Sequence, residues 1–494
     1  MGAVDLRYGS RLRRYTPVAQ RTVTFELHHL SALEQLDWLR RREVSVVDLT
    51  AHYLSRIERL DSGLGAFTTV TVDAALARAR ELDAAGPGTG ALWGLPLGDK
   101  DLWRRAGVVA GFGSRLTQDY VPKESDELIR VLDRAGAVSL GRTNAPEFGL
   151  PAYTESLVAD PARTPWDTSR GAGGSSGGAA VAVAAGLLPV APGSDGGGSI
   201  RIPAAATGLV GLKPSRGRVP AGSGFLSVGG LVVAGPLARS VADAALLLDA
   251  IAGPSPWSVA PPTWDGGAFL NAAVRGEGRY QLGVMTTSPW DDAYDITVSP
   301  EAAVALSLAV GELDALGHGI EAIALEPEVT YGPAFRTLWQ AGAADIPAEG
   351  EQLELLEPLT RWLVERGRGL GARELVRALE QLSRFERSVI RQFSSFDAVL
   401  TPALAMTPRP IGWFDGQDAE LNFAQQVQYT PWTSFANVSG LPAITLPIAM
   451  TADMLPMGVQ LIGRPGREDV LLAIGAQLER RIRWQDRHPA SWNL

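Results

Sequence analysis

The stretch RGAGGSSGGAAVAVAAGLLPVAPGSDGGGSIRIPAAATGLVGLK, residues 170–213, decides the fold of this chain. It contains two serine clusters flanked by glycine, GGSSGG at 173–178 and DGGGSIR at 195–201, separated by an apolar, alanine-rich segment. Glycine on both sides of a serine lets the backbone approach a ligand closely and point amide N–H groups into a cleft. About two dozen residues separate Ser175 from Ser199, which is enough for a helix, a turn and a short strand. We therefore expect the two hydroxyl groups to meet at one end of a layered sheet.

These motifs resemble the amidase signature family. The family reads GGSSGG, then a Ser/Thr-Asp-x-Gly-Gly-Ser-x-Arg run, then Gly-Leu-Lys-Pro, and the last two correspond here to residues 194–201 and 211–214. Residues 94–102 (GLPLGDKDL) resemble the family's strand end Gly-Ile-Pro-x-x-x-Lys-Asp, which supplies a lysine. The resemblance covers roughly residues 30–480 and is weakest at 255–430. Several coupled motifs make it more specific than a lone glycine-rich loop.

The resemblance implies an α/β fold, with one α/β/α layered domain over residues 1–494 and a mixed central sheet flanked by helices. The core is expected at 30–253 and 395–480, and a variable helical region at about 255–394 is expected to cover the active site. Capping and periodicity signals predict individual elements. The predicted helices lie at 30–62 (two helices, Ser45 capping the second), 125–135, 240–251 with Gly253 as C-cap, 299–316 and 469–481, the predicted strands at 280–285 and 320–325, and a glycine-rich loop at 224–235.

By the same resemblance, the protein is a serine amidohydrolase in which Lys100, Ser175 and Ser199 form a proton relay. Neutral Lys100 deprotonates Ser175, and Ser175 takes the proton from Ser199. Ser199 then attacks the carbonyl, becomes acylated, and is freed by water. A free lysine has a pKa near 10.4, and lowering it to roughly 7–8 requires burial. The relay therefore predicts an apolar, buried environment for Lys100.

The residues around this relay have supporting roles in the prediction. Consecutive glycines permit the backbone conformations of an anion-binding nest, so the oxyanion hole is expected at Gly196, Gly197 and Gly198. Asp195 and Arg201 either orient the site and steer substrate or form an ion pair that holds the loop, and Ser176 supports the site through hydrogen bonds.

Asp99 departs from the family pattern, which has an apolar residue before the lysine. Neighbouring side chains on a strand point to opposite faces. If the carboxylate nevertheless came near Lys100, it would stabilise the ammonium form and hinder base chemistry.

Substrate contacts are assigned to Thr154, Trp339, Trp413 and Trp432, with core packing or scaffolding as the alternative for each. The three tryptophans suggest an apolar or aryl amide, an oligoamide or a carbamate as substrate.

Other reaction classes fit the sequence less well. GGSSG also matches the nucleophile-elbow pattern G-x-S-x-G, but TPWDTSR, residues 164–170, is a poor strand before it. No Gly-Lys-Ser/Thr closes either glycine run, which excludes a P-loop. None of the five histidines lies between residues 53 and 317, so a Ser-His-Asp triad is unsupported. Two alternatives remain: the glutaminase subunit of a tRNA-dependent amidotransferase, and a catalytically silent binding protein.

Composition limits the partners and cofactors. The net charge of −9 without a basic block disfavours nucleic acid and anionic membranes. The absence of cysteine excludes a disulfide, a thiolate nucleophile and a cysteine metal site, and no metal or organic cofactor is implied. The N-terminus lacks an apolar signal region and the longest apolar run, 179–191, is too short to span a bilayer, so a cytoplasmic protein is expected. Lysine is nearly absent beside many arginines, as in a GC-rich bacterial genome. The expected partner is a small-molecule amide, and a homodimer is implied by the family alone.

Overall fold

A computed structural model describes residues 26–220, 228–253 and 267–494. Its larger sheet has eight strands in the order β4-β6-β5-β10-β11-β9-β7-β8. Pairing is antiparallel from β4 to β9 and parallel from β9 through β7 to β8, so the sheet is mixed. The strands are β4 (Val190–Asp195), β5 (Val210–Lys213), β6 (Val233–Ala238), β7 (Gln281–Val284), β8 (Gly319–Ala322), β9 (Ala398–Pro402), β10 (Ala443–Met450) and β11 (Pro456–Gly463).

A smaller sheet carries the lysine strand. It has the order β1-β3-β2, formed by β1 (Phe67–Val70), β3 (Val138–Thr143) and β2 (Pro96–Lys100). Strand β2 pairs with β3 in parallel and lies next to β4 of the larger sheet. The expected α/β class is confirmed, but the single central sheet is divided into two hydrogen-bonded sheets that adjoin at β2 and β4.

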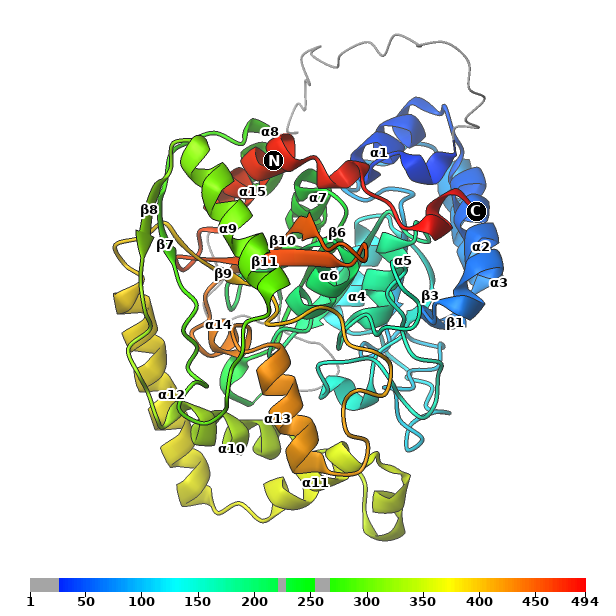
Figure 1. The fold of residues 1–494 in the computed structure, drawn as a ribbon. Coiled ribbons are helices and arrows are strands. Elements are labelled where there is room, and N and C mark those ends of the chain that lie inside the picture. Colours follow the sequence, from blue (N-terminus) through cyan, green and yellow to red (C-terminus); the bar gives the residue numbers. More distant parts are fainter. Residues whose placement is uncertain (1–25, 221–227, 254–266) are drawn as a thin grey trace.

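Helices cover both faces of the larger sheet. Strands β10 and β11 are buried almost throughout, as expected for strands with helices on either side. Helices α6, α9 and α15 contact β10 and β11, and in Figure 1 α7 and α15 lie above these strands, while α10, α11 and α13 lie farther away, below them. The helices are α1 (Ala32–Arg41), α2 (Val46–Leu60), α3 (Val72–Ala85), α4 (Glu127–Arg134), α5 (Gly177–Ala184), α6 (Arg201–Thr207), α7 (Val241–Ile251), α8 (Ala268–Arg275), α9 (Pro300–Ala315), α10 (Tyr331–Ala343), α11 (Pro358–Arg368), α12 (Ala372–Gln392), α13 (Ala419–Tyr429), α14 (Ser434–Val438) and α15 (Glu468–Ile482).

The helix starts follow the capping signals of the sequence. The hydroxyls of Ser45, Ser240 and Ser299 each accept a backbone N–H three residues later, and Pro300 occupies the first turn of α9. Helix α4 begins at Glu127 after Asp126, two residues later than predicted.

Two local predictions were wrong. Residues 233–235 belong to β6 rather than to a loop, because they pair with β4. The C-cap of α7 is Ala252 in an extended conformation rather than Gly253. Residues 224–227 of the predicted glycine-rich loop lie outside the described residues, as do residues 254–266 of the segment 254–267, for which the sequence predicts a linker.

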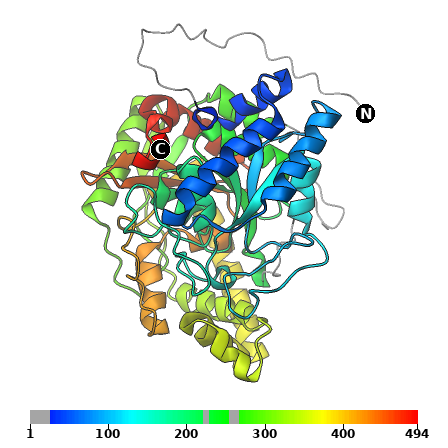
Figure 2. The same cartoon turned by 90° about the vertical axis from the view of Figure 1, so that its right-hand side faces the viewer.

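Helices α10, α11 and α12 lie in the region 255–394, which also contributes β7 and β8 to the larger sheet, and α13 packs beside α11. Figure 2 shows the same helices as a layer at the lower end of the molecule. Within the described ranges, no helix is both long and apolar enough to cross a bilayer.

We expect Leu461→Ala to lower the free energy of unfolding by about 2–5 kcal/mol. Leu461 is fully buried in the middle of β11, where it pairs with Ile444 and Leu400, so truncation leaves a cavity between strands. Urea denaturation measures the change. Leu461→Met is the control, with an expected cost below about 1.5 kcal/mol because its volume is similar. Equal costs for the two variants would contradict the prediction.

Candidate active site

Three serine hydroxyls converge on the amine of Lys100. Lys100 ends β2 and is fully buried. Its Nζ lies 2.9 Å from Ser175 Oγ, 2.8 Å from Ser176 Oγ and 3.0 Å from Ser194 Oγ. Ser175 and Ser176 immediately precede α5, and Ser194 lies near the end of β4. The adjoining ends of the two sheets therefore bring the lysine to both serine clusters.

Burial changes the protonation of this lysine. Removal from water lowers the pKa of Lys100 to about 7, and the Asp195 carboxylate acts in the opposite direction more weakly. Near neutral pH a large share of the amine is uncharged, so Nζ can accept a proton from a hydroxyl.

Asp99 does not oppose this shift. Its carboxylate binds the guanidinium of Arg105 and accepts a hydrogen bond from the Ser139 hydroxyl. Burial alone would raise the pKa of Asp99, but the Arg105 charge outweighs it and the pKa is lowered. Because Asp99 is paired on the other side of the strand, it does not stabilise a charged Lys100.

Ser175 and Ser199 line a common cavity, which we call the serine cavity. The peptide between Gly174 and Ser175 is cis. The backbone N–H of Ser176 donates to the carbonyl oxygen of Ser199 at 3.1 Å, which ties the two serine clusters together. The hydrogen bonds among the described residues include the Lys100–Ser175 contact but none between the Ser175 and Ser199 hydroxyls. Ser199 therefore lines the same cavity as Ser175, but its hydroxyl is not hydrogen-bonded to Ser175 or to Lys100.

The glycine loop faces the cavity, but not all its N–H groups are free. Gly198 donates its N–H to Asp195 Oδ1 at 2.8 Å, so the expected role of Gly198 in an oxyanion hole does not fit. Its φ of +135° and a Thr433 hydroxyl 2.5 Å from the place of a Cβ explain why it is glycine. In the described part of the chain, the N–H groups of Gly196, Gly197 and Ser199 are not used in hydrogen bonds.

Asp195 and Arg201 form a buried ion pair that holds this loop. Both side chains are essentially inaccessible, and Arg201 Nη2 lies 2.9 Å from Asp195 Oδ1. Asn437 Nδ2 donates to the same carboxylate and Gln460 accepts from Arg201. Burial would raise the pKa of Asp195, but Arg201 outweighs it and holds the pKa well below its usual range. Neither residue lines a cavity with Ser199, so the geometry favours loop support over substrate steering.

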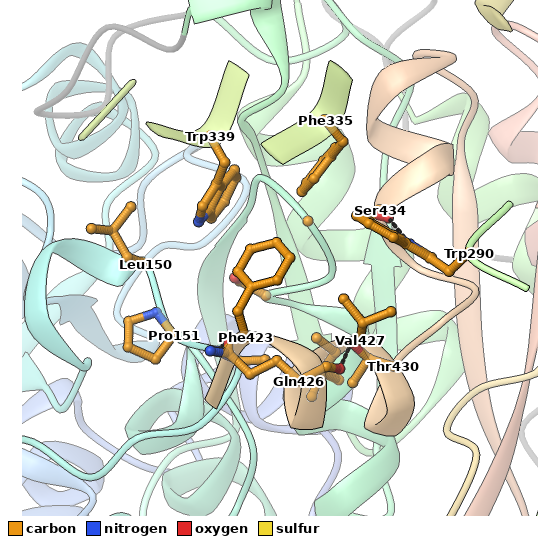
Figure 3. Close-up of a pocket in the computed structure, with 14 residues that line it drawn as sticks. Leu150, Pro151, Trp290, Phe335, Trp339, Phe423, Gln426, Val427, Thr430 and Ser434 are labelled. Carbon is orange, nitrogen blue, oxygen red and sulfur yellow. Dashed lines mark hydrogen bonds between the residues drawn. The ribbon is translucent and has the colours of Figure 1, made fainter. Parts of the chain in front are cut away.

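A second cavity, which we call the aromatic cavity, also reaches Ser199. Figure 3 shows Phe335 and Trp339 of α10 facing Phe423 of α13 across it, with Trp290 at one side. Phe335 and Trp339 stack with ring centroids 5.5 Å apart, one helical turn from each other. Of the described residues that line the two cavities, none is Asp, Glu, Lys or Arg. The surroundings of Ser199 are therefore uncharged, with polar side chains such as Gln426, Thr430 and Ser434 among the aromatic and aliphatic ones.

Of the four predicted substrate contacts, Trp339 lines both cavities at Ser199 and the other three line neither of them. Trp432 is fully buried in the core with its Nε1–H donating to Thr286, and Trp413 packs against Phe414. The Thr154 hydroxyl donates to the carbonyl of Gly173 and so braces the GGSSGG loop. Thr154, Trp413 and Trp432 are thus placed in core or scaffold positions away from the two cavities, which sequence spacing alone does not distinguish from a cavity wall.

Several cavity residues were missed. Phe335 is not among the predicted site residues, although its spacing of four from Trp339 places both on one face of a helix. Trp290 lies in a loop, and no local pattern around it indicates its place. Ser194 opens the 194–201 motif, but its contact with Lys100 depends on how β4 lies beside β2. The further missed lining residues include Leu102, Phe148, Leu150, Leu338, Ile346, Phe423 and Val427.

One group of ligand-type side chains lies elsewhere. Glu26, His28 and His52 bring a carboxylate and two imidazole nitrogens within 4.8 Å of one another. His28 Nε2 lies 3.0 Å from the Trp492 carbonyl oxygen, and burial together with the Arg56 charge lowers the pKa of His28 to about 2. None of these residues lines a cavity with Ser199, so the group connects chain segments and is not part of the serine site.

Fold and site together define an amide-hydrolysing enzyme. The family model described as Amidase matches residues 48–472, and the chain belongs to this family. Putative amidase AmiB2 of Mycobacterium tuberculosis is 38% identical over 451 residues, which are 89% of this chain and 93% of that protein. A glutamyl-tRNA(Gln) amidotransferase subunit of Azotobacter vinelandii is 34% identical, with coverage of 94% of this chain and 100% of that protein.

Solved structures agree with this assignment. The structure of 6-aminohexanoate cyclic dimer hydrolase complexed with substrate matches with a TM-score of 0.86 and 30% identity, covering 94% of this chain and 99% of that one. A bacterial aryl acylamidase of the amidase signature family matches with a TM-score of 0.82 and 25% identity, covering 93% and 97%. The predicted family and enzyme class are confirmed.

We expect Arg201→Ala to cost about 3–5 kcal/mol of unfolding free energy, because it leaves the buried Asp195 carboxylate without its counter-charge. Chemical denaturation followed by circular dichroism measures the cost. The control is Arg467→Ala, which breaks the exposed Arg467–Asp469 pair and is expected to cost less than about 1 kcal/mol. A loss of similar size in both variants would refute the role given to the buried pair.

Proposed function

We propose that this protein hydrolyses a carboxylic amide to an acid and an amine or ammonia through a Ser199 acyl-enzyme, with Ser175 and Lys100 carrying the proton. The observation that supports this most is the 2.9 Å contact between the fully buried Lys100 amine and the Ser175 hydroxyl. An uncharged amine in that position is a base, and the serine it contacts opens onto the same cavity as Ser199.

The proposed acylation moves one proton through two serines. Lys100 Nζ accepts the Ser175 proton while Ser175 Oγ accepts the proton of Ser199 Oγ. Ser199 Oγ forms a bond to the carbonyl carbon, and the oxyanion receives N–H groups from the loop of Gly196, Gly197 and Ser199. The carbon–nitrogen bond then breaks. The departing nitrogen takes the proton from the Ser175 hydroxyl, and Ser175 then regains a proton from the Lys100 ammonium.

Deacylation repeats the sequence with water in place of the serine nucleophile. Ser175 takes a proton from the attacking water and gives its own proton to Lys100 as before. Collapse of the second tetrahedral species returns the proton to Ser199 Oγ and frees the acid. Each half-reaction therefore leaves Lys100 in its starting, uncharged form.

The substrate we propose is an apolar or aryl amide, an oligoamide or a carbamate. The support is the uncharged, aromatic lining of the two cavities at Ser199. The likeness to a cyclic dimer hydrolase and an aryl acylamidase points the same way. The glutaminase alternative has the likeness to an amidotransferase component in its favour. Free glutamine, however, carries an ammonium and a carboxylate, and the described lining of the two cavities offers a counter-charge to neither group.

We expect the wild type to hydrolyse anilides and other apolar amides and Ser199→Ala to lose at least about a thousandfold in kcat/KM. An activated aryl ester should give a burst of one product equivalent per site with the wild type and none with Ser199→Ala, because only Ser199 can be acylated. Thr117→Ala, a variant of a hydroxyl outside both cavities, is the matched control and should burst normally. Glutamine turned over more efficiently than every anilide would overturn the substrate class.

The rate on a neutral anilide should rise with pH and level off above about 7. Lys100 is the proton acceptor, its pKa is lowered by burial to about 7, and only its uncharged form can act. Below that pH the uncharged fraction, and with it kcat/KM, falls about tenfold per pH unit.

Lys100→Arg serves as the control for this profile. Arginine stays charged at every pH used, so the variant should be inactive without recovery at high pH. A wild-type profile that rose only above about pH 9 would mean that burial does not lower the pKa of Lys100 in the working enzyme.

A further inference from the structure

The serine cavity and the aromatic cavity adjoin each other and share three lining residues. Leu150, Ser199 and Trp339 line both of them. Ser175 and Ser194 line only the serine cavity, whereas Phe423 and Val427 line only the aromatic cavity. The acylated atom, Ser199 Oγ, thus stands where the two spaces join.

We propose that Trp339 divides the site into an amine compartment, the serine cavity, and an acyl compartment, the aromatic cavity, so that the substrate is a secondary amide with apolar groups on both sides of the scissile bond. This assignment rests on the proposed function.

The path of the proton determines which cavity binds the amine part of the substrate and which binds the acyl part. The departing nitrogen receives its proton from Ser175, so it must lie next to that hydroxyl when the carbon–nitrogen bond breaks. Ser175 opens into the serine cavity and not into the aromatic one. The amine therefore leaves into the serine cavity. The acyl group, held by its carbonyl carbon on Ser199, extends the other way into the aromatic cavity.

The residues that line the amine compartment indicate which kind of amine it binds. Away from its serines, the compartment is lined by apolar side chains, among them Leu102, Phe148, Leu338 and Ile346. Ammonia from a primary amide would leave these walls uncovered, whereas an alkyl or aryl amine would bury them. Because the acyl compartment also presents aromatic and aliphatic side chains, among them Trp290, Phe335 and Phe423, binding free energy is available from both halves of a secondary amide.

Trp339 is well placed to keep the two compartments apart. Its ring stacks on Phe335 within α10, which fixes its direction. A Cβ built on Gly196 or Gly197 would stand 3.6 Å or 3.8 Å from the Trp339 ring, so the indole lies over the loop that carries the proposed oxyanion donors. The ring therefore forms a wall at the junction rather than the floor of one space.

The test varies the two halves of the substrate independently. One series joins hexanoic acid to ammonia, methylamine, butylamine and aniline. The other joins aniline to acetic, butyric, hexanoic and octanoic acids. For each enzyme, kcat/KM gives an amine ratio (butyl over methyl) and an acyl ratio (octanoyl over acetyl). Wild type should prefer the secondary amides to hexanamide.

Gly342→Leu narrows the amine compartment at its edge. Gly342 lines the serine cavity from α10 at an exposed position, and a Cβ there would meet no atom within 4 Å, so the larger side chain fits without a clash. We expect the amine ratio to fall at least about tenfold and the acyl ratio to change less than about threefold. Gly342→Ala, with a single methyl group, is the matched control for the effect of a side chain on helix α10 itself.

Val427→Phe on α13 fills the acyl compartment. It should lower the acyl ratio at least about tenfold and change the amine ratio less than about threefold. Val427→Ala enlarges it and should raise the acyl ratio, which keeps the test decisive if the phenylalanine variant does not fold. Trp339→Ala should lower both ratios together, because removal of the indole joins the two compartments into one space. Melting curves confirm that each variant is folded.

The outcomes separate the compartment assignment from the proposed function. If Gly342→Leu changed the acyl ratio and Val427→Phe the amine ratio, or if both changed the same ratio, the assignment would be wrong. Preference for hexanamide over the secondary amides would also refute it. Absence of hydrolysis and of a burst with every substrate would instead refute the proposed function.

Discussion

The site depends on the removal of one lysine amine from water. Lys100 is surrounded by the hydroxyls of Ser175, Ser176 and Ser194, which solvate it only in part, and its pKa falls to about 7. Burial alone does not make a base, as Lys213 demonstrates. The pKa of Lys213 is also lowered by burial to about 7, but its Nζ contacts the carbonyl oxygen of Pro214. A buried amine becomes useful for catalysis where it contacts a hydroxyl that opens onto a cavity.

The second constraint is the loop that carries Ser199. The Asp195 carboxylate accepts hydrogen bonds from the N–H of Gly198, the guanidinium of Arg201 and the side-chain amide of Asn437. A buried ion pair of this kind stabilises the fold little in net terms, but here it fixes geometry because both charges are also hydrogen-bonded to their neighbours. Among the described residues, no side chain accepts a hydrogen bond from the N–H groups of Gly196 and Gly197. The backbone conformation alone therefore sets the direction of these groups. Rigidity of the loop is thus obtained without placing a charge in the cavities.

The helical cover and the sheet have different tasks. Strand ends and the starts of α5 and α6 hold Lys100, Ser175 and Ser199, whereas α10 and α13 supply the aromatic walls. The solved structures it resembles keep the same overall fold at about 25–30% identity. In the proposed mechanism the cover contributes side chains and not reacting groups, so it is free to change with the substrate. The proposed reacting groups lie on elements whose positions depend on sheet pairing.

The sequence by itself determined the family, the α/β class and the serine and lysine positions, because these reside in glycine patterns and strand ends that are local. Helix starts at Ser45, Ser240 and Ser299 followed for the same reason, since a cap is decided within four residues. Only the tertiary structure decided that Asp99 faces Arg105, that Gly198 has given its N–H to Asp195, and that Trp339 rather than Trp413 or Trp432 reaches Ser199. Those facts depend on which surfaces meet across the sheets and the cover, and residues far apart in the chain contribute to each of them.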